Sequence, residues 1–235
     1  GEAEFTFADY QGGQFSIVSK AVKRDGDPGF VRLTERLGYT EENAPLYMQN
    51  RRQTQWWQLT DGGRVLYLAY NSCREDEEYP IEELLAELEA AFEEAAPQAV
   101  VVDLRHNGGG DSRILQPVIR RLGEGAKNGE FDLYAFVGTG TFSSAVLNAI
   151  ELEEEAGAVL VGEPTGGKPN HYGEIKFFEL PNLEARVSYS TKYFERYTGE
   201  RAYVVSIYPE IDAQISLSSF LQRRSSAMEA VLRRM

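Results

Sequence analysis

The feature that most constrains this chain is a repeated alternation of short apolar runs with amphipathic segments between residues 81 and 161. Residues 99–104 read Ala-Val-Val-Val-Asp-Leu, which is typical of a strand buried on both faces in a parallel sheet. The preceding residues 81–95 place apolar side chains on one face of a helix, and Pro97 follows. Further helices are predicted at 114–122 and 144–155 and further strands at 133–137 and 158–161. This order predicts βαβ units and a mostly parallel sheet with right-handed crossovers.

The flanking regions are richer in β-like alternation. Residues 3–20 alternate around Gly12-Gly13, which predicts a hairpin, whereas residues 23–50 contain many turn formers. We therefore expect a small N-terminal lobe at residues 1–45, or part of an upstream region, and an α/β core at residues 46–235. Within that core the sequence predicts one further hairpin, further strands and a last helix, at residues 55–70, 175–180, 185–189 and 225–234.

Composition excludes several classes of function. The 37 acidic and 24 basic side chains give a formal charge of -13, which repels nucleic acid and anionic membrane surfaces. Cys73 is the single cysteine, and only His106 and His171 could join it in a metal site, so neither a disulfide nor a zinc cluster is expected. No apolar run is long enough for membrane insertion. Because the chain begins with Gly, we expect that a leader, with or without an upstream region, has been removed.

The predicted strand at 99–104 runs into a glycine loop (residues 105–110) that ends in Gly108, Gly109 and Gly110. Glycine lets backbone N–H groups point into a cavity, where they can donate to a phosphate or to a developing oxyanion. The spacing fits neither the dinucleotide-binding nor the Walker pattern. An ordinary glycine-rich turn is the alternative.

A second candidate is Ser143, at the junction between a Gly/Thr segment that follows the strand at 133–137 and the helix at 144–155. A serine at such a junction projects its hydroxyl from the top of the sheet, and the N–H of Ser144 can face the same carbonyl. Helix capping is the alternative role, because serine is a favoured N-cap residue.

A third candidate is Lys168, in a turn after the strand at 158–161. A lysine acts as a general base for serine only when its amine is neutral, which requires burial to lower its pKa from about 10.4. The alternative is a solvated surface lysine.

Together the three segments resemble the C-terminal processing, or tail-specific, serine peptidases, which have a crotonase- and ClpP-like α/β core. Residues 103–110 match Asp-Leu-Arg-x-Asn-x-Gly-Gly, and residues 141–143 match Thr-x-Ser before a helix. Residues 162–168 match Gly-Glu-x-Thr-x-Gly-Lys. The resemblance extends from about Leu46 to the C-terminus, and the lysine follows the serine by 25 positions (168 minus 143) as in that family.

The resemblance implies a serine peptidase without metal or cofactor that acts on a peptide or protein in the cell envelope, the periplasm or outside the cell. Ser143 would attack the carbonyl, Lys168 would take its proton, and an acyl-enzyme would form. The oxyanion donors would be the N–H groups of Gly109 and Ser144, with Gly108 or Gly110 as alternatives to Gly109. The residues expected to shape the loop are Asp103, Arg105, Asn107, Gly108 and Gly110.

Two departures from the family pattern leave alternatives open. The family usually has glutamine four residues after the lysine, where this chain has Tyr172, preceded by His171. Either residue could orient Lys168, and His171 could itself be the base; His106 is a weaker candidate. The region before Leu46 contains no carboxylate-binding loop of a PDZ domain, so the resemblance is to compact members of the family.

The predicted protein is thus an α/β serine endopeptidase with a small β-rich N-terminal lobe. One alternative is a catalytically silent module of the same fold that binds an apolar ligand, with the Trp56-Trp57 pair lining the site. The other alternative is an esterase or amidase for a small acyl substrate. The sequence does not indicate an oligomeric state.

Overall fold

The computed structural model describes residues 2–8, 12–20, 32–183 and 185–235. The chain divides into two compact units, Gly1–Thr40 and Glu41–Met235, and each is described by itself. The sequence placed a domain boundary a few residues later, after residue 45, and that assignment stays a prediction.

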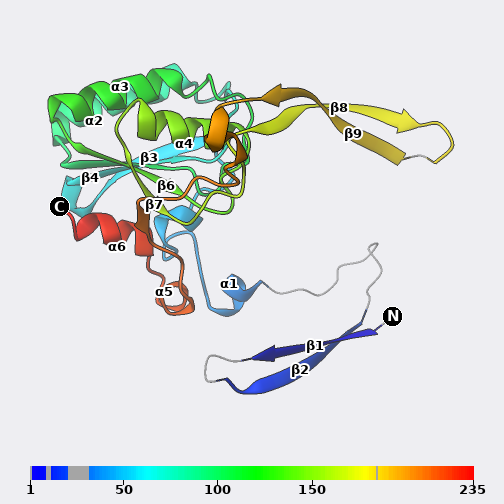
Figure 1. Cartoon of the computed structure of the whole chain (residues 1–235). Helices are drawn as coiled ribbons and strands as arrows, with labels where there is room; N and C mark the ends of the chain where they lie inside the picture. The colour runs from blue at the N-terminus through cyan, green and yellow to red at the C-terminus, as the bar shows by residue number, and fades with distance from the viewer. Residues whose placement is uncertain (1, 9–11, 21–31, 184) are drawn as a thin grey trace. The chain divides into compact units, whose positions relative to one another are not determined.

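The first unit contains the predicted N-terminal hairpin. Strand β1 (Glu2–Ala8) pairs antiparallel with β2 (Gln14–Lys20), and every described residue of both strands is exposed. The short helix α1 (Leu33–Arg36) follows (Figure 1). The predicted loop region at 23–50 lies partly outside the described residues.

The second unit is built on a six-stranded sheet with the strand order β10-β7-β6-β5-β4-β3. Strands β4 to β7 and β10 run parallel, and only β3 is antiparallel to its neighbour. The predicted mostly parallel sheet is confirmed. The strands are β3 (Gln55–Thr60), β4 (Val65–Tyr70), β5 (Ala99–Asp103), β6 (Asp132–Val137), β7 (Val159–Gly162) and β10 (Ile211–Asp212).

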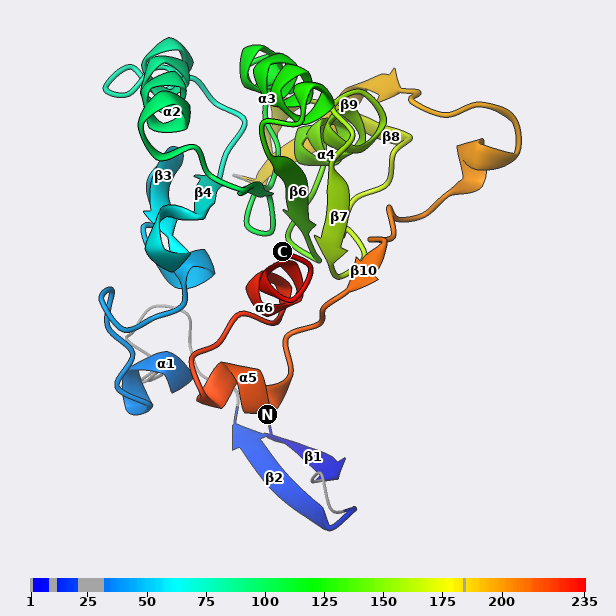
Figure 2. The same ribbon diagram turned by 90° about the vertical axis from the view of Figure 1, so that its left-hand side faces the viewer.

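Helices cover both faces of this sheet (Figure 2). On one face lie α2 (Ile81–Ala95), α3 (Gln116–Asn128) and α4 (Ser144–Glu154), and α6 (Ser226–Leu232) lies on the other. A further short helix, α5 (Leu217–Leu221), precedes α6. The helix predicted at 114–122 begins two residues later and continues to 128, where Gly129 ends it in the left-handed conformation.

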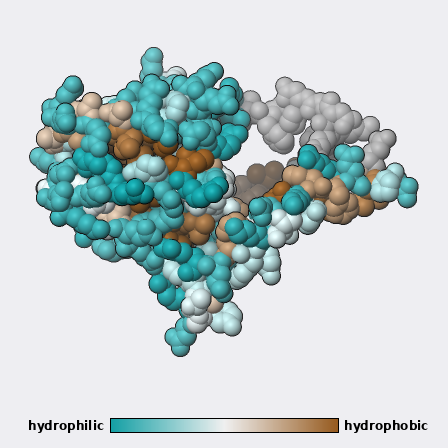
Figure 3. Space-filling model, turned by 90° about the horizontal axis from the view of Figure 1, so that it is seen from above, coloured by the Kyte–Doolittle hydropathy of each residue, from teal (hydrophilic) through white to brown (hydrophobic). Residues whose placement is uncertain are grey.

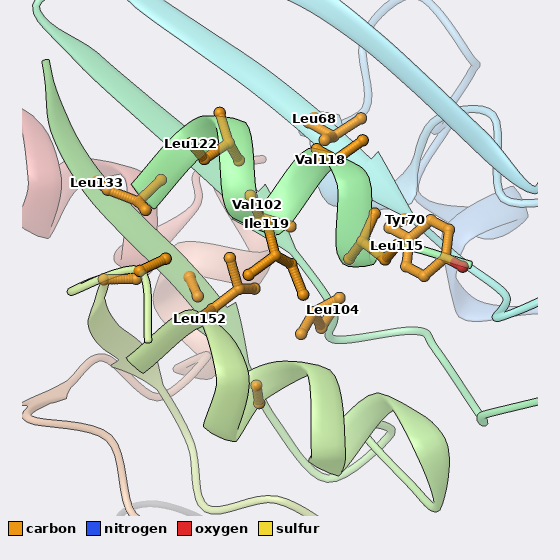
Figure 4. Close-up of a cluster of buried hydrophobic side chains, with 14 of the residues drawn as sticks. Leu68, Tyr70, Val102, Leu104, Leu115, Val118, Ile119, Leu122, Leu133 and Leu152 are labelled. Atoms are coloured by element: carbon orange, nitrogen blue, oxygen red, sulfur yellow. The ribbon is translucent and has the colours of Figure 1, made fainter. Parts of the chain in front are cut away.

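Alternate residues of each strand pack into two hydrophobic cores, one on each face of the sheet. In β5, Val100 and Val102 face α2, α3 and α4, whereas Val101 packs with α6 on the opposite face. Figure 4 shows the larger core, in which Leu115, Val118 and Leu122 of the α3 region meet side chains of the sheet. Burial of β5 on both faces explains why its sequence is almost uninterruptedly apolar.

A long antiparallel hairpin, β8 (His171–Leu180) with β9 (Ala185–Phe194), projects from this unit (Figure 1). Most of its residues are exposed, and hydrophobic side chains lie along it among hydrophilic ones (Figure 3). Its exposed large apolar or aromatic residues are Tyr172, Ile175, Phe177, Phe178, Tyr189 and Tyr193. No helix among the described residues is long and apolar enough to cross a membrane.

The topology brings the three candidate segments to one edge of the sheet. Strands β5, β6 and β7 are parallel neighbours, so the loops at their carboxyl ends emerge side by side. Open α/β sheets build their sites at this edge.

Candidate active site

Ser143 has an unusual backbone conformation at the start of α4. Its φ is 52° and its ψ is -125°, a region that non-glycine residues rarely occupy and that is found at strained functional positions. A serine on a sharp strand-to-helix turn of this kind exposes its hydroxyl. Although Ser143 is the N-cap residue, its side chain makes no capping hydrogen bond, so capping does not explain this serine.

The glycine loop lies directly against Ser143. A Cβ atom added at Gly109 would be 2.8 Å from the Ser143 Cβ and 3.0 Å from the Ser144 nitrogen. The Ser144 hydroxyl donates to the Gly110 carbonyl at 2.6 Å, which ties the start of α4 to the loop. Only a residue without a side chain allows this approach at Gly109, whose φ is 104°.

Asn107 holds the glycine loop in this shape. Its buried side chain donates to the Tyr70 carbonyl at 2.9 Å and accepts from the Gly109 N–H at 2.9 Å. The main-chain carbonyl of Asn107 also accepts a hydrogen bond from the Phe142 N–H at 3.0 Å. The same residue therefore links β4, the glycine loop and the serine loop (residues 138–143), and it occupies the Gly109 N–H that the sequence proposed as an oxyanion donor.

Beneath the loop, Asp103 and Arg105 form a buried ion pair. The Arg105 Nε donates to Asp103 Oδ1 at 2.9 Å, a second guanidinium nitrogen donates to Oδ2, and Tyr67 donates to Oδ2 at 2.6 Å. Burial acts to raise the pKa of Asp103, but the Arg105 charge and these hydrogen bonds hold it below its ordinary value. The guanidinium also lies over the rings of Tyr47 and Phe136.

The lysine loop (residues 163–170) also packs against the serine loop. The Gly167 N–H donates to the Thr141 carbonyl at 3.1 Å, and a Cβ atom at Gly167 would lie 3.0 Å from the Ser143 nitrogen. Lys168 therefore directly follows Gly167, whose backbone lies against Ser143, the candidate nucleophile. Its side chain is exposed and has no hydrogen bond or ion pair among the described residues.

His171 and Tyr172 differ in their relation to this loop. The His171 Nδ1 lies 2.9 Å from the Lys168 carbonyl oxygen, and a carbonyl can only accept, so Nδ1 carries the proton and Nε2 has a free lone pair when the ring is neutral. The His171 ring stacks on Phe194 with 5.4 Å between centroids. Tyr172 is exposed and pairs instead with the ring of Tyr193.

Ser143 and Ser144 line a cavity of about 470 Å³. The base of the β8–β9 hairpin also lines this cavity, through Glu174, Lys192 and Phe194. Sequence reasoning missed these three residues, which carry no local motif and lie up to 51 positions after Ser143 (194 minus 143).

Other sequence candidates lie elsewhere. The His106 Nδ1 lies 3.1 Å from an Arg51 nitrogen, and His106 lines a separate cavity of about 190 Å³. Burial lowers the pKa of His106. Trp56 is buried against Tyr67, and neither it nor Trp57 lines the Ser143 cavity. The described residues contain no group of three or more His, Cys, Asp or Glu side chains able to hold a metal ion.

Two glycines of the loop should respond differently to alanine. A Cβ atom at Gly110, where φ is 141°, would lie 2.0 Å from the Cys73 carbonyl oxygen, whereas one at Gly108 would meet nothing within 4 Å. We expect Gly110→Ala to lower the free energy of unfolding by about 2 kcal/mol or more and Gly108→Ala to change it by less than about 0.5 kcal/mol. Urea denaturation measures both, and equal effects would contradict the close contact.

Comparison with solved structures places the fold among the S41 peptidases. The chain is similar to a predicted peptidase from Parabacteroides merdae (16% identity, TM-score 0.53, 77% of this chain and 64% of that one). It is also similar to a predicted S41 protease from Bacteroides fragilis (18% identity, TM-score 0.53, 77% of this chain and 56% of that one). A third similar structure is mature CPAF (13% identity, TM-score 0.54, 98% of this chain and 65% of that one). The chain spans less than two thirds of each of these structures. No family model and no curated protein sequence matches it.

Proposed function

We propose that this protein is a serine endopeptidase that hydrolyses peptide bonds through an acyl-enzyme on Ser143. The observation that carries the proposal is the strained backbone of Ser143, whose side chain makes no capping bond and lies against the glycine loop. A strained backbone conformation of this kind persists only where the surrounding structure enforces it, and such positions cluster at active sites. The likeness in fold to S41 peptidase structures supports the same reaction class.

In the proposed mechanism the Ser143 hydroxyl attacks the substrate carbonyl and Lys168 accepts its proton, later returning it to the leaving amine. Lys168 is exposed, so this role requires bound substrate to exclude water from the amine; catalytic hydrogen bonds often tighten only in the substrate complex. The Ser144 N–H, which has no hydrogen-bond partner among the described residues, and one N–H of the glycine loop would stabilise the oxyanion.

Covalent labelling tests the reaction class. A fluorophosphonate should modify the wild-type protein at Ser143, as located by mass spectrometry of the labelled peptide. Absence of labelling across roughly pH 6 to 10, the range in which a buried lysine loses its proton, would rule out an activated serine. Parallel assays with peptide and ester substrates of the same acyl group separate a peptidase from a small-molecule esterase.

The general base can be identified by two substitutions. If Lys168 is the base, Lys168→Ala should lower kcat about 10²- to 10⁴-fold, whereas His171→Ala should have a much smaller effect. The reverse order would assign the base to His171, whose Nε2 is free to accept a proton in the tautomer described above. Single-turnover acylation rates measure the step directly, and equal small effects of both changes would contradict either assignment.

A further inference from the structure

Four charged side chains line the Ser143 cavity. Asp111 and Arg113 neutralise each other, since Arg113 Nε donates to Asp111 Oδ1 at 2.8 Å and a second nitrogen approaches Oδ2. Glu174 and Lys192 remain, and neither forms an ion pair among the described residues. The hairpin base therefore presents one uncompensated cation and one uncompensated anion to the cavity.

Lys192 is held in place by an aromatic ring. Its Nζ lies 4.6 Å from the centroid of Phe194, which itself lines the cavity and stacks on His171. A ring face attracts an ammonium group without using its hydrogen-bond donors, so those donors stay available to a ligand. Because Lys192 is exposed, it suits anion binding better than proton abstraction.

Glu174 lies at an irregular position of β8. Gly173 pairs with Lys192 and Ile175 pairs with Ser190 in one continuous register, so Glu174 lies opposite Thr191, but these two residues do not form a regular pair. Its φ of 54° is rare for glutamate, and the Thr191 hydroxyl donates to its carbonyl at 2.7 Å. A positive φ departs from regular strand geometry, and at this position Glu174 lines the same cavity as Lys192.

We propose that Lys192 is a specificity-determining residue that binds a carboxylate of the substrate within the Ser143 cavity, and that Glu174 weakens this preference by repulsion. The proposal rests on the proposed function, since it names the substrate class of the same site. The substrate would be a peptide with an acidic group near the bond to be cleaved. That group is either an acidic side chain or the free C-terminal carboxylate, which offer the same chemistry to Lys192.

Binding to the Ser143→Ala variant tests this inference without turnover. Fluorescence anisotropy would compare a short dye-labelled peptide of alternating glutamate and alanine with its glutamine counterpart, each with an amidated and a free C-terminus. Lys192→Gln and Glu174→Gln are then added separately. Lys176→Gln is the matched control, because Lys176 is an exposed lysine of the same hairpin that does not line the cavity.

We expect Lys192→Gln to weaken binding of the peptide that carries the recognised carboxylate about five-fold at low salt, an effect of the size of one partly exposed ion pair, and to leave binding of the amidated glutamine peptide unchanged. Glu174→Gln should strengthen acidic-peptide binding, and Lys176→Gln should change nothing. A loss confined to free C-termini identifies the terminal carboxylate as the ligand, and a loss with amidated glutamate peptides identifies the side chain. Equal losses for all four peptides, including the amidated glutamine peptide that carries no carboxylate, or no loss for any of them, would overturn the inference.

The result that would contradict the proposed peptidase function is different from the result that would contradict the role of Lys192. If the wild-type protein does not react with fluorophosphonate but the Lys192-dependent preference persists, the site binds acidic peptides without cleaving them. If labelling and hydrolysis occur without that preference, only the role of Lys192 is wrong.

Discussion

Replacing Ser143 by alanine is expected to lower kcat for peptide hydrolysis by at least about 10⁴-fold, because a nucleophile that forms a covalent intermediate has no substitute. The variant should fold normally, since the Ser143 hydroxyl makes no capping bond. Alanine should tolerate the backbone conformation as well as serine does, because both carry a Cβ atom. Peptide binding should therefore persist, and the loss should appear in kcat rather than in KM.

Ser144→Ala is the control for this prediction. It removes the hydroxyl that donates to the Gly110 carbonyl but keeps the backbone N–H. We expect this variant to retain fluorophosphonate labelling and part of its activity, whereas Ser143→Ala should lose labelling altogether. Labelling that survives in Ser143→Ala would show that another serine reacts, and Ser143 would no longer be the nucleophile.

The parallel core was predictable because its elements have strong local signals. Residues 81–95 carry apolar side chains at helical spacing and end just before Pro97, and the helix has these bounds. The run at 99–104 predicts a doubly buried strand, and β5 is buried throughout. By contrast, β10 has two residues and α5 has five, so neither is long enough to show a period.

The convergence of the three candidate loops was also predictable from topology, since parallel strands place their carboxyl ends at one edge of a sheet. The part of the cavity that the β8–β9 hairpin lines was not predictable. It depends on the positive φ of Glu174 and on the pairing of β8 with β9, and a shift of one residue in that register would turn Lys192 to the other face. Register of an exposed hairpin is weakly encoded, because neither face is buried in a core.

The sequence also did not determine the direction of the Lys168 side chain. Sequence spacing predicts that it follows a turn beside Ser143, and the contact of Gly167 with the Ser143 nitrogen fits that position. Spacing does not determine where a long side chain points, and the Lys168 side chain is exposed. Its role as base therefore stays a prediction that depends on substrate binding.

The largest expected effect on stability comes from Arg105→Met. This change leaves Asp103 buried without its guanidinium partner, and breaking a buried ion pair in this way costs about 3–5 kcal/mol. Arg113→Met is a matched control, because Asp111 and Arg113 have the same sequence spacing and the same two-point contact but Arg113 is exposed. Urea denaturation at neutral pH should show a large loss for Arg105→Met and little change for Arg113→Met.

The pH dependence of that loss tests its electrostatic cause. In the wild-type protein the pKa of Asp103 is lowered, so the stability it contributes is present above its unfolded pKa of about 3.9 and is lost as the pH falls through the folded value. Without Arg105, burial should raise this pKa instead, and the variant should lose stability as the pH rises through the raised value. The difference in unfolding free energy between the two proteins should therefore shrink from about pH 7 to about pH 4. A difference that is constant with pH would instead assign the loss to the contacts of the Arg105 side chain with Tyr47 and Phe136.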